Sequence, residues 1–355
     1  MTESEAPLRS AVIGCRMAHV RVLADLDDFE LAAVCDLDEE AAREAAECGR
    51  DVGVYTDSAR MLEQEKPEVV AVGTPNDSHA ELTIQAAEAG ARGICCEKPL
   101  AVNMGEGRAM LDACRRNGTR LICNHQRRMR AEMVKARELI EDGALGDVYL
   151  IRGTCAGDVL SDGTHTVDSI RWLAGDVDVK WVLGQIYREE PDPDEPKAGG
   201  YHRSGGYRYG HLVESGGMGT LEFETGLRAE MLFGDVRFPG RPYQDYEVLG
   251  TEGRLWRKGD RAEPALLIED TRGGGWRGVE LEDEAESRSA MRESYRAFAR
   301  TIREGASHPL SGESALKDLE VVMAVYESAR TNRRIDLPLR QEELPLRLMV
   351  EQRTA

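Results

Sequence analysis

The first third of the chain alternates short apolar runs with helix-like segments, and this alternation restricts the possible folds more than any other feature. The apolar runs have the length of strands and few polar positions, which is typical of parallel strands covered on both faces. Strands that alternate with helices predict a doubly wound parallel sheet between Arg9 and about Asn124. The predicted strands are 11–13, 31–35, 69–72, 93–96 and 121–123, and the predicted helices are 39–48, 58–64, 79–89 and 104–117.

After Asn124 the strands show alternating faces and are separated by turn signals, which predicts a mostly antiparallel sheet with helices on one face. The predicted strands are 148–155, 180–187, 217–224, 228–233 and 246–249, and the predicted helices are 131–142, 165–174, 286–304 and 314–332. The segment after Asp336 is predicted to be irregular. We therefore expect an α/β domain over residues 1–124, an α+β domain over 125–340 and a tail over 341–355. The helices within 286–332 are candidates for packing back on the first domain.

The composition restricts the partners. The 355 residues include 46 Lys and Arg against 65 Asp and Glu, a net charge of -19. This charge disfavours nucleic acid and an anionic membrane surface as partners. The acidic start of the chain does not resemble a signal peptide, and no apolar run approaches the length of a membrane span. We expect a cytoplasmic protein that acts on a small molecule.

All eight cysteines lie within the first 155 residues, none forms a Cys-x-x-Cys pair, and several fall inside predicted strands. Buried free thiols in a reducing cytoplasm are the favoured interpretation. A zinc site is a poor alternative, and no metal is expected.

An acidic, proline-rich stretch at 189–196 leads into a segment rich in glycine, tyrosine and arginine at 199–209. A solvated excursion between two strands is the favoured interpretation. A lid or an oligomer contact is the alternative, since long loops in compact domains are often functional.

Glu97-Lys98-Pro99 directly follows the apolar run 93–96, at the carboxyl end of a predicted parallel strand. In an open α/β sheet, ligands bind beyond the carboxyl ends of the strands. Lysine is a poor residue for closing a buried strand unless its amine has a task. The position therefore predicts chemistry at Lys98, and it makes both Glu97 and Lys98 candidate cofactor contacts.

The turn after the first strand is Gly14-Cys15-Arg16-Met17-Ala18-His19. A dinucleotide-binding turn has the pattern G-x-G-x-x-G, and only Gly14 fits it, because Arg16 and His19 stand at the second and third glycine positions. One interpretation is a cofactor turn formed by Gly14, Cys15, Arg16 and Met17, in which the Arg16 guanidinium contacts a phosphate. The other is an ordinary strand–helix turn.

Asp36 ends the second strand, 22 residues after Gly14. An acid at this place accepts hydrogen bonds from the adenosine ribose and repels a 2′-phosphate, which favours NAD over NADP. The alternative is an exposed aspartate at a strand end.

Gly73-Thr74-Pro75-Asn76 follows the strand at 69–72, and His79 opens the next helix. Thr74, Pro75, Asn76 and His79 could run along a nicotinamide ribose. The alternative is a proline turn in which Asn76 or Ser78 caps the helix, and both can hold together.

Asp162, His165 and Asp168 cluster at the start of a predicted helix, where His165 and Asp168 are three residues apart and share a face. A lone histidine is usually structural. The cluster favours a functional role for Asp162 and His165.

Taken together, these motifs resemble the glucose–fructose oxidoreductase/inositol dehydrogenase/rhizopine-catabolism (Gfo/Idh/MocA) family over nearly the whole chain. The likeness depends on the order and spacing of segments that are each weak alone. They are 33–36, Gly73 to Asn76 with His79, Glu97-Lys98-Pro99, 125–128, 143–146, 163–168, 250–253 and 311–313.

The resemblance implies an NAD(P)-binding Rossmann domain, followed by an α+β domain whose open sheet often mediates oligomerisation. It implies oxidation or reduction of a carbon of a sugar, inositol or related polyol. Lys98 would hydrogen-bond the reacting oxygen, His165 would relay or exchange its proton, and the acid near His165, for which Asp162 is the candidate, would orient the pair. The turn at Gly14 to His19 is shorter and poorer in glycine than in the family. The family's acid four residues before the histidine is replaced by Ser161, with Asp162 one step later.

The sequence leaves two alternative functions open. One is a glycosidase or lyase that retains NAD and oxidises its substrate only transiently, and the other is a sensor that binds a nucleotide or sugar without catalysis. Substrate contacts are expected from Lys98, Gln126, Arg128, Asp162 and His165, with His202 and His211 as further candidates. One face of the antiparallel sheet needs a cover, which predicts a homodimer or homotetramer.

Overall fold

The structure is a computed structural model that describes residues 6–190, 205–235, 243–270, 273–281 and 287–354, and it divides into two compact units. Unit 1 comprises residues 1–101, 105–126 and 287–316, and unit 2 comprises residues 102–104, 127–286 and 317–355. Unit 1 therefore includes a helix from near the carboxyl end of the chain.

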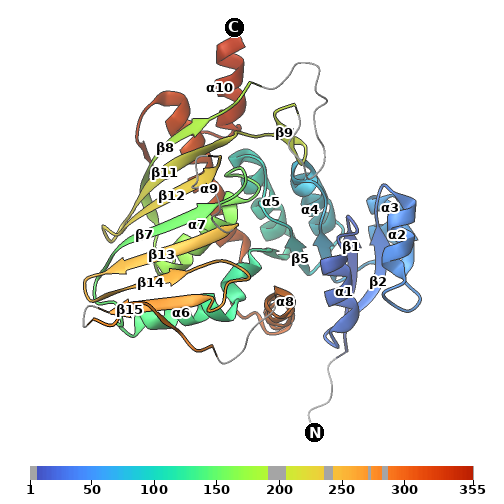
Figure 1. The fold of residues 1–355 in the computed structure, drawn as a ribbon. Coiled ribbons are helices and arrows are strands. Elements are labelled where there is room, and N and C mark those ends of the chain that lie inside the picture. The colour runs from blue at the N-terminus through green and yellow to red at the C-terminus, as the bar shows by residue number, and fades with distance from the viewer. Residues whose placement is uncertain (1–5, 191–204, 236–242, 271–272, 282–286, 355) are drawn as a thin grey trace. The chain divides into compact units, whose positions relative to one another are not determined.

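Unit 1 contains a six-stranded parallel sheet in the order β3-β2-β1-β4-β5-β6 (Figure 1). Every residue of β4 and β5 is buried, as expected for strands covered on both faces. The order reverses between β1 and β4, and ligands bind beyond the carboxyl ends of strands at such a switch point. The predicted doubly wound sheet is confirmed. Its strands are β1 (Leu8–Ile13), β2 (Phe29–Cys35), β3 (Gly53–Tyr55), β4 (Val69–Val72), β5 (Gly93–Cys96) and β6 (Arg120–Cys123).

The helices of unit 1 begin where the sequence supplies side-chain caps. The Asp38 carboxylate accepts hydrogen bonds from two backbone N–H groups in the first turn of α2, and the Asp57 carboxylate accepts one from the backbone N–H of Arg60 in α3. Such caps satisfy donors that have no partner within the helix. The helices between the strands are α1 (Met17–Asp25), α2 (Glu39–Ala46), α3 (Ser58–Glu65), η1 (Asn76–Ser78), α4 (His79–Glu88) and α5 (Met104–Asn117).

Helix α8 (Ser287–Glu304) packs into the core of unit 1, although it lies far along the chain. Tyr295 and Phe298 are fully buried in the same cluster as side chains of α1 and β2. A Cβ at Gly93 would lie 2.4 Å from Ile302 and 2.8 Å from Phe298, so glycine at the start of β5 permits this close approach.

Unit 2 contains a nine-stranded sheet in the order β16-β15-β14-β13-β7-β12-β11-β8-β17. Neighbouring strands pair antiparallel except β7 with β12, so the predicted mostly antiparallel sheet is confirmed. A separate pair consists of β9 (Tyr207–Arg208) and β10 (His211–Leu212). The sheet strands are β7 (Val148–Cys155), β8 (Val179–Tyr187), β11 (Gly216–Phe223), β12 (Arg228–Gly234), β13 (Gln244–Gly250), β14 (Gly253–Arg257), β15 (Leu266–Asp270), β16 (Arg277–Gly278) and β17 (Ile335–Asp336).

Helices cover one face of this sheet (Figure 1). Glycines in the strands let them approach closely: a Cβ at Gly153 would lie 2.7 Å from Thr166 of α7, and one at Gly184 would lie 2.7 Å from the backbone of Val325 in α9. The opposite face exposes Leu183, Tyr187 and Met218. The helices are α6 (Ala131–Glu141), α7 (Gly163–Leu173) and α9 (Gly312–Thr331), of which α9 starts in unit 1.

Several sequence predictions differ from the structure, which also contains α1, β9, β10 and β17 outside the predicted helices and strands. Strand β3 was not predicted, because its three residues are partly exposed and form no apolar run. Strands β14, β15 and β16 were missed as well. The segment after Asp336 is not wholly irregular, since α10 (Pro345–Thr354) forms there around the buried Leu346. Within the described residues, no helix combines the length and the apolar character that a membrane span requires.

Candidate functional site

The turn between β1 and α1 is short and tightly packed. Gly14 has a φ of +79°, and a Cβ there would lie 2.7 Å from the backbone of Gly73 and Thr74, so only glycine fits. Helix α1 begins at Met17 with neither a side-chain cap nor an acidic residue in its first turn. Its amino-terminal end thus retains the partial positive charge that favours an anion.

Asp36 connects this turn to the end of β2. Its Oδ2 accepts a hydrogen bond of 2.8 Å from the backbone N–H of Cys15, and its Oδ1 accepts one of 3.1 Å from Asp38. Burial and the Asp36 charge raise the pKa of the Cys15 thiol to about 12, so this thiol is neutral near pH 7. Each oxygen of Asp36 has a further lone pair for another donor.

The turn after β4 is held by side chains of its own segment. The Ser78 hydroxyl donates to the Pro75 carbonyl at 2.8 Å and lies 2.7 Å from the Thr74 hydroxyl, from which it can accept. Ser78 therefore does not cap α4 with its side chain, contrary to one of the expectations. Asn76 is buried, while Pro75 is exposed.

His79 connects the same turn to the residue after Lys98. Its Nδ1 lies 2.8 Å from the carbonyl oxygen of Pro99 and its Nε2 lies 3.1 Å from that of Thr74. Complete burial lowers the pKa of His79 despite these two carbonyls, so the ring is neutral and donates to one of them at a time. The Lys98–Pro99 peptide bond is cis.

Glu97 lies at the centre of a buried polar cluster in unit 1. Its Oε1 lies 2.9 Å from Nε2 of His19 and accepts a hydrogen bond of 2.7 Å from the Asn124 amide. Its Oε2 lies 3.4 Å from the Arg16 guanidinium and accepts a hydrogen bond of 3.2 Å from the backbone N–H of Lys98. Lys98 itself is half-buried. The carboxylate thus connects the turn after β1 with the lysine after β5.

Glu97 and His19 hold each other in their charged forms. Burial alone would raise the pKa of Glu97, but hydrogen bonding to His19 and the charges of His19, Arg16 and Lys98 lower it well below its usual range. Burial alone would lower the pKa of His19, but hydrogen bonding to Cys95 and Glu97 and the Glu97 charge raise it to about 9. An imidazolium and a carboxylate therefore face each other near pH 7.

In unit 2, Asp162 precedes the first turn of α7 and is buried. Its Oδ2 lies 2.5 Å from the Arg208 guanidinium, and its Oδ1 accepts a hydrogen bond from the Tyr243 hydroxyl. A Cβ at Gly157 would collide with this carboxylate, so a glycine is needed there. Burial and the Asp162 charge raise the pKa of the Tyr243 hydroxyl, which stays protonated and donates.

A cavity of about 310 Å³ in unit 2 is lined by these groups and by Asp158, Glu214 and Asp235. Arg208 bridges Asp162 to Asp158, whose Oδ2 lies 2.9 Å from the guanidinium. Burial and the Asp158 charge raise the pKa of Glu214 to about 7, although the Tyr326 hydroxyl donates to it at 2.6 Å. The cavity is rich in acceptors, and one of its lining carboxyls, Glu214, changes protonation near neutral pH.

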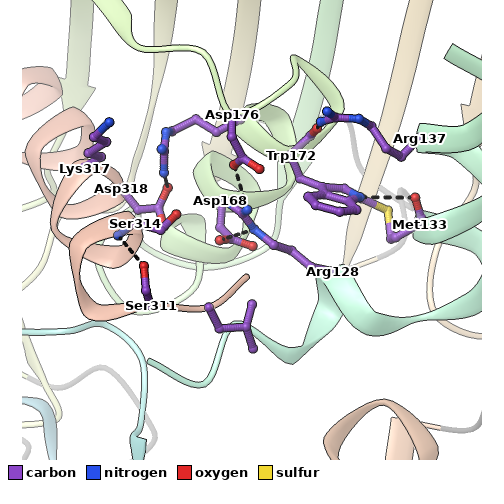
Figure 2. A network of polar contacts seen from close by, with 12 residues as sticks. Arg128, Met133, Arg137, Asp168, Trp172, Asp176, Ser311, Ser314, Lys317 and Asp318 are labelled. Carbon is purple, nitrogen blue, oxygen red and sulfur yellow. Dashed lines mark hydrogen bonds and ion pairs between the residues drawn. The ribbon is translucent and has the colours of Figure 1, made fainter. Parts of the chain in front are cut away.

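His165 and Asp168 both lie on α7, as the sequence predicted, and both are buried. Figure 2 shows Arg128 between Asp168 and Asp176: its Nε donates to Asp168 at 2.6 Å and its Nη1 to Asp176 at 2.7 Å. The Arg128 side chain is 1% exposed and its guanidinium lies 5.5 Å from the ring centre of Trp172. Asp168, Asp176 and Trp172 all belong to unit 2, as does Arg128.

The other substrate candidates differ in position. Gln126 is half-buried at the start of the short helix η2 (Gln126–Met129). His211 is buried, and its Nε2 lies 3.1 Å from the Ser161 hydroxyl. His202 lies outside the described residues.

The sequence matches the family models of two domains that belong to one oxidoreductase family. An NAD-binding Rossmann domain matches residues 8–125, and a C-terminal α/β domain matches residues 152–337. The chain belongs to the Gfo/Idh/MocA oxidoreductase family. The resemblance predicted from the sequence is confirmed, as is the prediction that the chain is an oxidoreductase.

Relatives of this Gfo/Idh/MocA member act on sugars and polyols, by their names. D-apiose dehydrogenase of Paraburkholderia graminis is 27% identical over 95% of this chain and 92% of its own length. D-glucoside 3-dehydrogenase of Escherichia coli is 26% identical over 94% and 99%. D-xylose 1-dehydrogenase (NADP(+)) 2 of Haloferax volcanii is 24% identical over 93% and 98%. Among solved structures, a levoglucosan dehydrogenase with NADH and levoglucosan has a TM-score of 0.77 at 22% identity, covering 94% and 100%.

Several residues of the candidate site of this Gfo/Idh/MocA protein were not predicted as such from the sequence. His19 was recognised only as a substitute for a glycine, and its buried partner Tyr295 is 276 residues away, where no spacing rule applies. No sequence motif marks the short strand β9 or the connections between strands, which supply Arg208, Glu214 and Tyr243. An isolated acid after the apolar Leu212-Val213 was the only signal for Glu214.

Proposed function

We propose that the chain is an NAD(P)-dependent dehydrogenase that oxidises or reduces a hydroxyl-bearing carbon of a sugar, inositol or related polyol, with NAD as the preferred cofactor. The observation that carries the proposal is the position of Glu97 and Lys98 beyond β5, at the same sheet edge as the turns after β1, β2 and β4. Membership of an oxidoreductase family and the named relatives support it.

The residues of unit 1 fit a dinucleotide. Gly14, Cys15, Arg16 and Met17 form the turn where a pyrophosphate binds in this fold, at the uncapped end of α1. Asp36 presents a carboxylate to an adenosine ribose and disfavours a 2′-phosphate, which is why we propose NAD. Thr74, Pro75, Asn76 and His79 would lie along the nicotinamide ribose. The cofactor, when bound, supplies the hydride acceptor or donor.

Lys98 is the residue that we propose to handle the hydroxyl proton. Its primary amine can hydrogen-bond the reacting oxygen and accept a proton when hydride leaves the same carbon. Glu97 orients the start of this segment through its hydrogen bond with the Lys98 backbone. His165 is proposed to exchange the proton, a role carried over from the family resemblance.

The cavity of unit 2 is proposed to receive hydroxyl groups of the substrate. Asp162, Asp158 and Tyr243 offer the acceptors and the donor that sugar hydroxyls require. Because Asp162 lies against Arg208 and Tyr243, we propose that it binds substrate and does not act as a freely titrating acid. Gln126 remains a proposed substrate contact.

The test is a panel of sugars and inositols assayed with NAD and with NADP for net reduced cofactor. A dehydrogenase gives a stoichiometric rise in absorbance at the wavelength of NADH. A redox-neutral enzyme converts substrate without any such rise, and a sensor converts none. Either result would replace the proposal with the corresponding alternative.

Lys98→Ala and Lys98→Arg sharpen this test. Both variants should lose at least about 100-fold in kcat, because Ala lacks the amine and Arg does not give up a proton near neutral pH. Binding of NAD measured by calorimetry should change little in either. Rates near those of the unaltered protein in Lys98→Ala would remove Lys98 from the mechanism.

Assembly and location belong to the same proposal. The exposed Leu183, Tyr187 and Met218 on the uncovered face of the unit 2 sheet support a homodimer or homotetramer. The eight free thiols support a reducing compartment, the cytoplasm.

A further inference from the structure

Three charged side chains meet beside the short turn after β1. Glu97 lies 2.9 Å from His19 and 3.4 Å from Arg16. The side chains of His19 and Glu97 are 0% and 9% exposed, whereas that of Arg16 is 43% exposed. Two of the three charges are therefore fixed inside unit 1, and the third reaches solvent.

His19 carries its charge in a fully buried position. Nε2 faces Glu97, and Nδ1 lies 2.7 Å from the Tyr295 hydroxyl on α8. The ionisable groups that face His19 are Glu97, Cys95 and Tyr295. The pKa of Tyr295 is raised well above its usual value, so Glu97 supplies the negative charge that His19 balances.

The cluster of Glu97, His19 and Arg16 has one more positive charge than negative charges when His19 is protonated. One carboxylate faces one imidazolium and one guanidinium, so the His19–Glu97 pair is neutral without Arg16. A buried carboxylate with Arg16 as its sole cation would resist losing that cation, because an uncompensated buried charge is costly. With His19 protonated, the guanidinium can leave Glu97 without exposing such a charge.

We propose that His19 is a positioning residue: it neutralises Glu97 and thereby frees the Arg16 guanidinium to bind the pyrophosphate of the dinucleotide. Arg16 and His19 stand at two positions where the glycine motif would have glycine, so side chains replace part of the contact that backbone N–H groups make there. A guanidinium presents paired donors that suit phosphate oxygens. This inference rests on the proposed function.

The first test compares ligands by calorimetry on the full chain. ADP-ribose contains the pyrophosphate, and adenosine does not. Arg16→Gln should weaken ADP-ribose about 10- to 100-fold and leave adenosine unchanged, as expected for losing a charge-assisted hydrogen bond. Arg21→Gln, an exposed residue of the same helix α1, is the matched control and should change neither.

The second test is the pH profile of ADP-ribose binding. Affinity should be constant from pH 7 to 8 and fall above pH 9, where His19 loses its proton and Glu97 retains Arg16. Lys98 and His79 also face Glu97, so the profile must be repeated in Arg16→Gln. The fall should disappear in that variant, because the effect acts through Arg16.

His19→Gln should bind ADP-ribose as weakly as Arg16→Gln does at every pH. If this buried variant does not fold, the pH profile of the unaltered chain still tests the role of His19. Equal affinities of the unaltered chain and Arg16→Gln for ADP-ribose, or a fall above pH 9 that persists in Arg16→Gln, would overturn the inference. Failure of the unaltered chain to bind ADP-ribose at all would instead overturn the proposed function.

Discussion

Two buried glutamates, one in each unit, are held in different protonation states. Glu97 is 7% exposed and Glu214 is 1% exposed, so burial pushes the pKa of both upward. Glu97 faces His19 and Arg16, and its pKa falls. Glu214 lies near Asp158, and its pKa rises to about 7. The charge of the neighbouring side chains, more than the depth of burial, therefore decides the state of a buried acid in this protein.

The two units use these acids differently. In unit 1 the ionised Glu97 orders the segment that precedes Lys98 and pairs with a buried histidine. In unit 2 Glu214 lines a cavity together with Asp158 and Asp162, where a carboxyl near its midpoint at neutral pH can donate or accept a hydrogen bond. The comparison predicts that equal substitutions in the two units have unequal effects.

The largest effect is expected for Glu97→Gln. Removing the carboxylate leaves the buried His19 without its counter-charge, and breaking such a pair costs about 3–5 kcal/mol. Glu214→Gln should cost less than about 1 kcal/mol, because the amide oxygen can still accept from the Val159 backbone N–H while the amide NH2 donates to the Tyr326 hydroxyl. Urea denaturation followed by circular dichroism at pH 7 measures both. If both variants lost the same free energy of unfolding, Glu97 and Glu214 would not differ in their contribution to stability.

His19→Gln should next change the pH dependence of stability. Folded His19 keeps its proton up to about pH 9, whereas an unfolded histidine releases it near its ordinary pKa of about 6.5. Its contribution to the free energy of unfolding is thus complete below pH 6.5 and lost as the pH rises to 9. The variant should lack this decline. Denaturation midpoints at pH 6, 7.5 and 9 in both proteins provide the measurement, and parallel curves would refute a charged His19.

The elements that were predictable from the sequence are those specified by local patterns. Continuous apolar runs predicted β4 and β5, and their position predicted Glu97 and Lys98 as site residues. The three-residue strand β3 has no such run, and α10 begins at a proline after a polar stretch. The contact of His19 with Tyr295 depends on α8 returning to unit 1, which no local pattern encodes. Arg208 and Tyr243 reach Asp162 by the same kind of long-range packing.

Glu214→Gln should also change how the free energy of unfolding depends on pH, between about pH 4.5 and 7, and by less than His19→Gln does. The pKa of Glu214 is raised from 4.5 to about 7, so its favourable contribution is complete below pH 4.5 and lost as the pH rises through 7. We therefore compare the free energy of unfolding of the variant with that of the unaltered chain at two pH values. The difference should favour the variant more at pH 8 than at pH 5. All four tryptophans lie in unit 2, so their fluorescence follows this transition. Glu63→Gln on the surface of α3 is the control, and the same shift in it would point to a general charge effect.

The smallest effect is expected for Asp36→Asn, which tests a third acid at the sheet edge of unit 1. The amide oxygen can still accept from the Cys15 backbone N–H, and only the longer bond from the exposed Asp38 N–H is lost, so the turn should keep its structure. Loss of the charge should reduce the preference for NAD over NADP about tenfold, because the 2′-phosphate is no longer repelled. Dissociation constants of the two cofactors give the ratio. An unchanged ratio would assign the preference to other residues.

Calorimetric titration of the full chain with NAD and with NADP tests the central claim most directly. The account predicts saturable binding at one site per chain, with NAD bound more tightly than NADP. Titrations that show no binding heat with either cofactor, checked by an independent binding method, would contradict it.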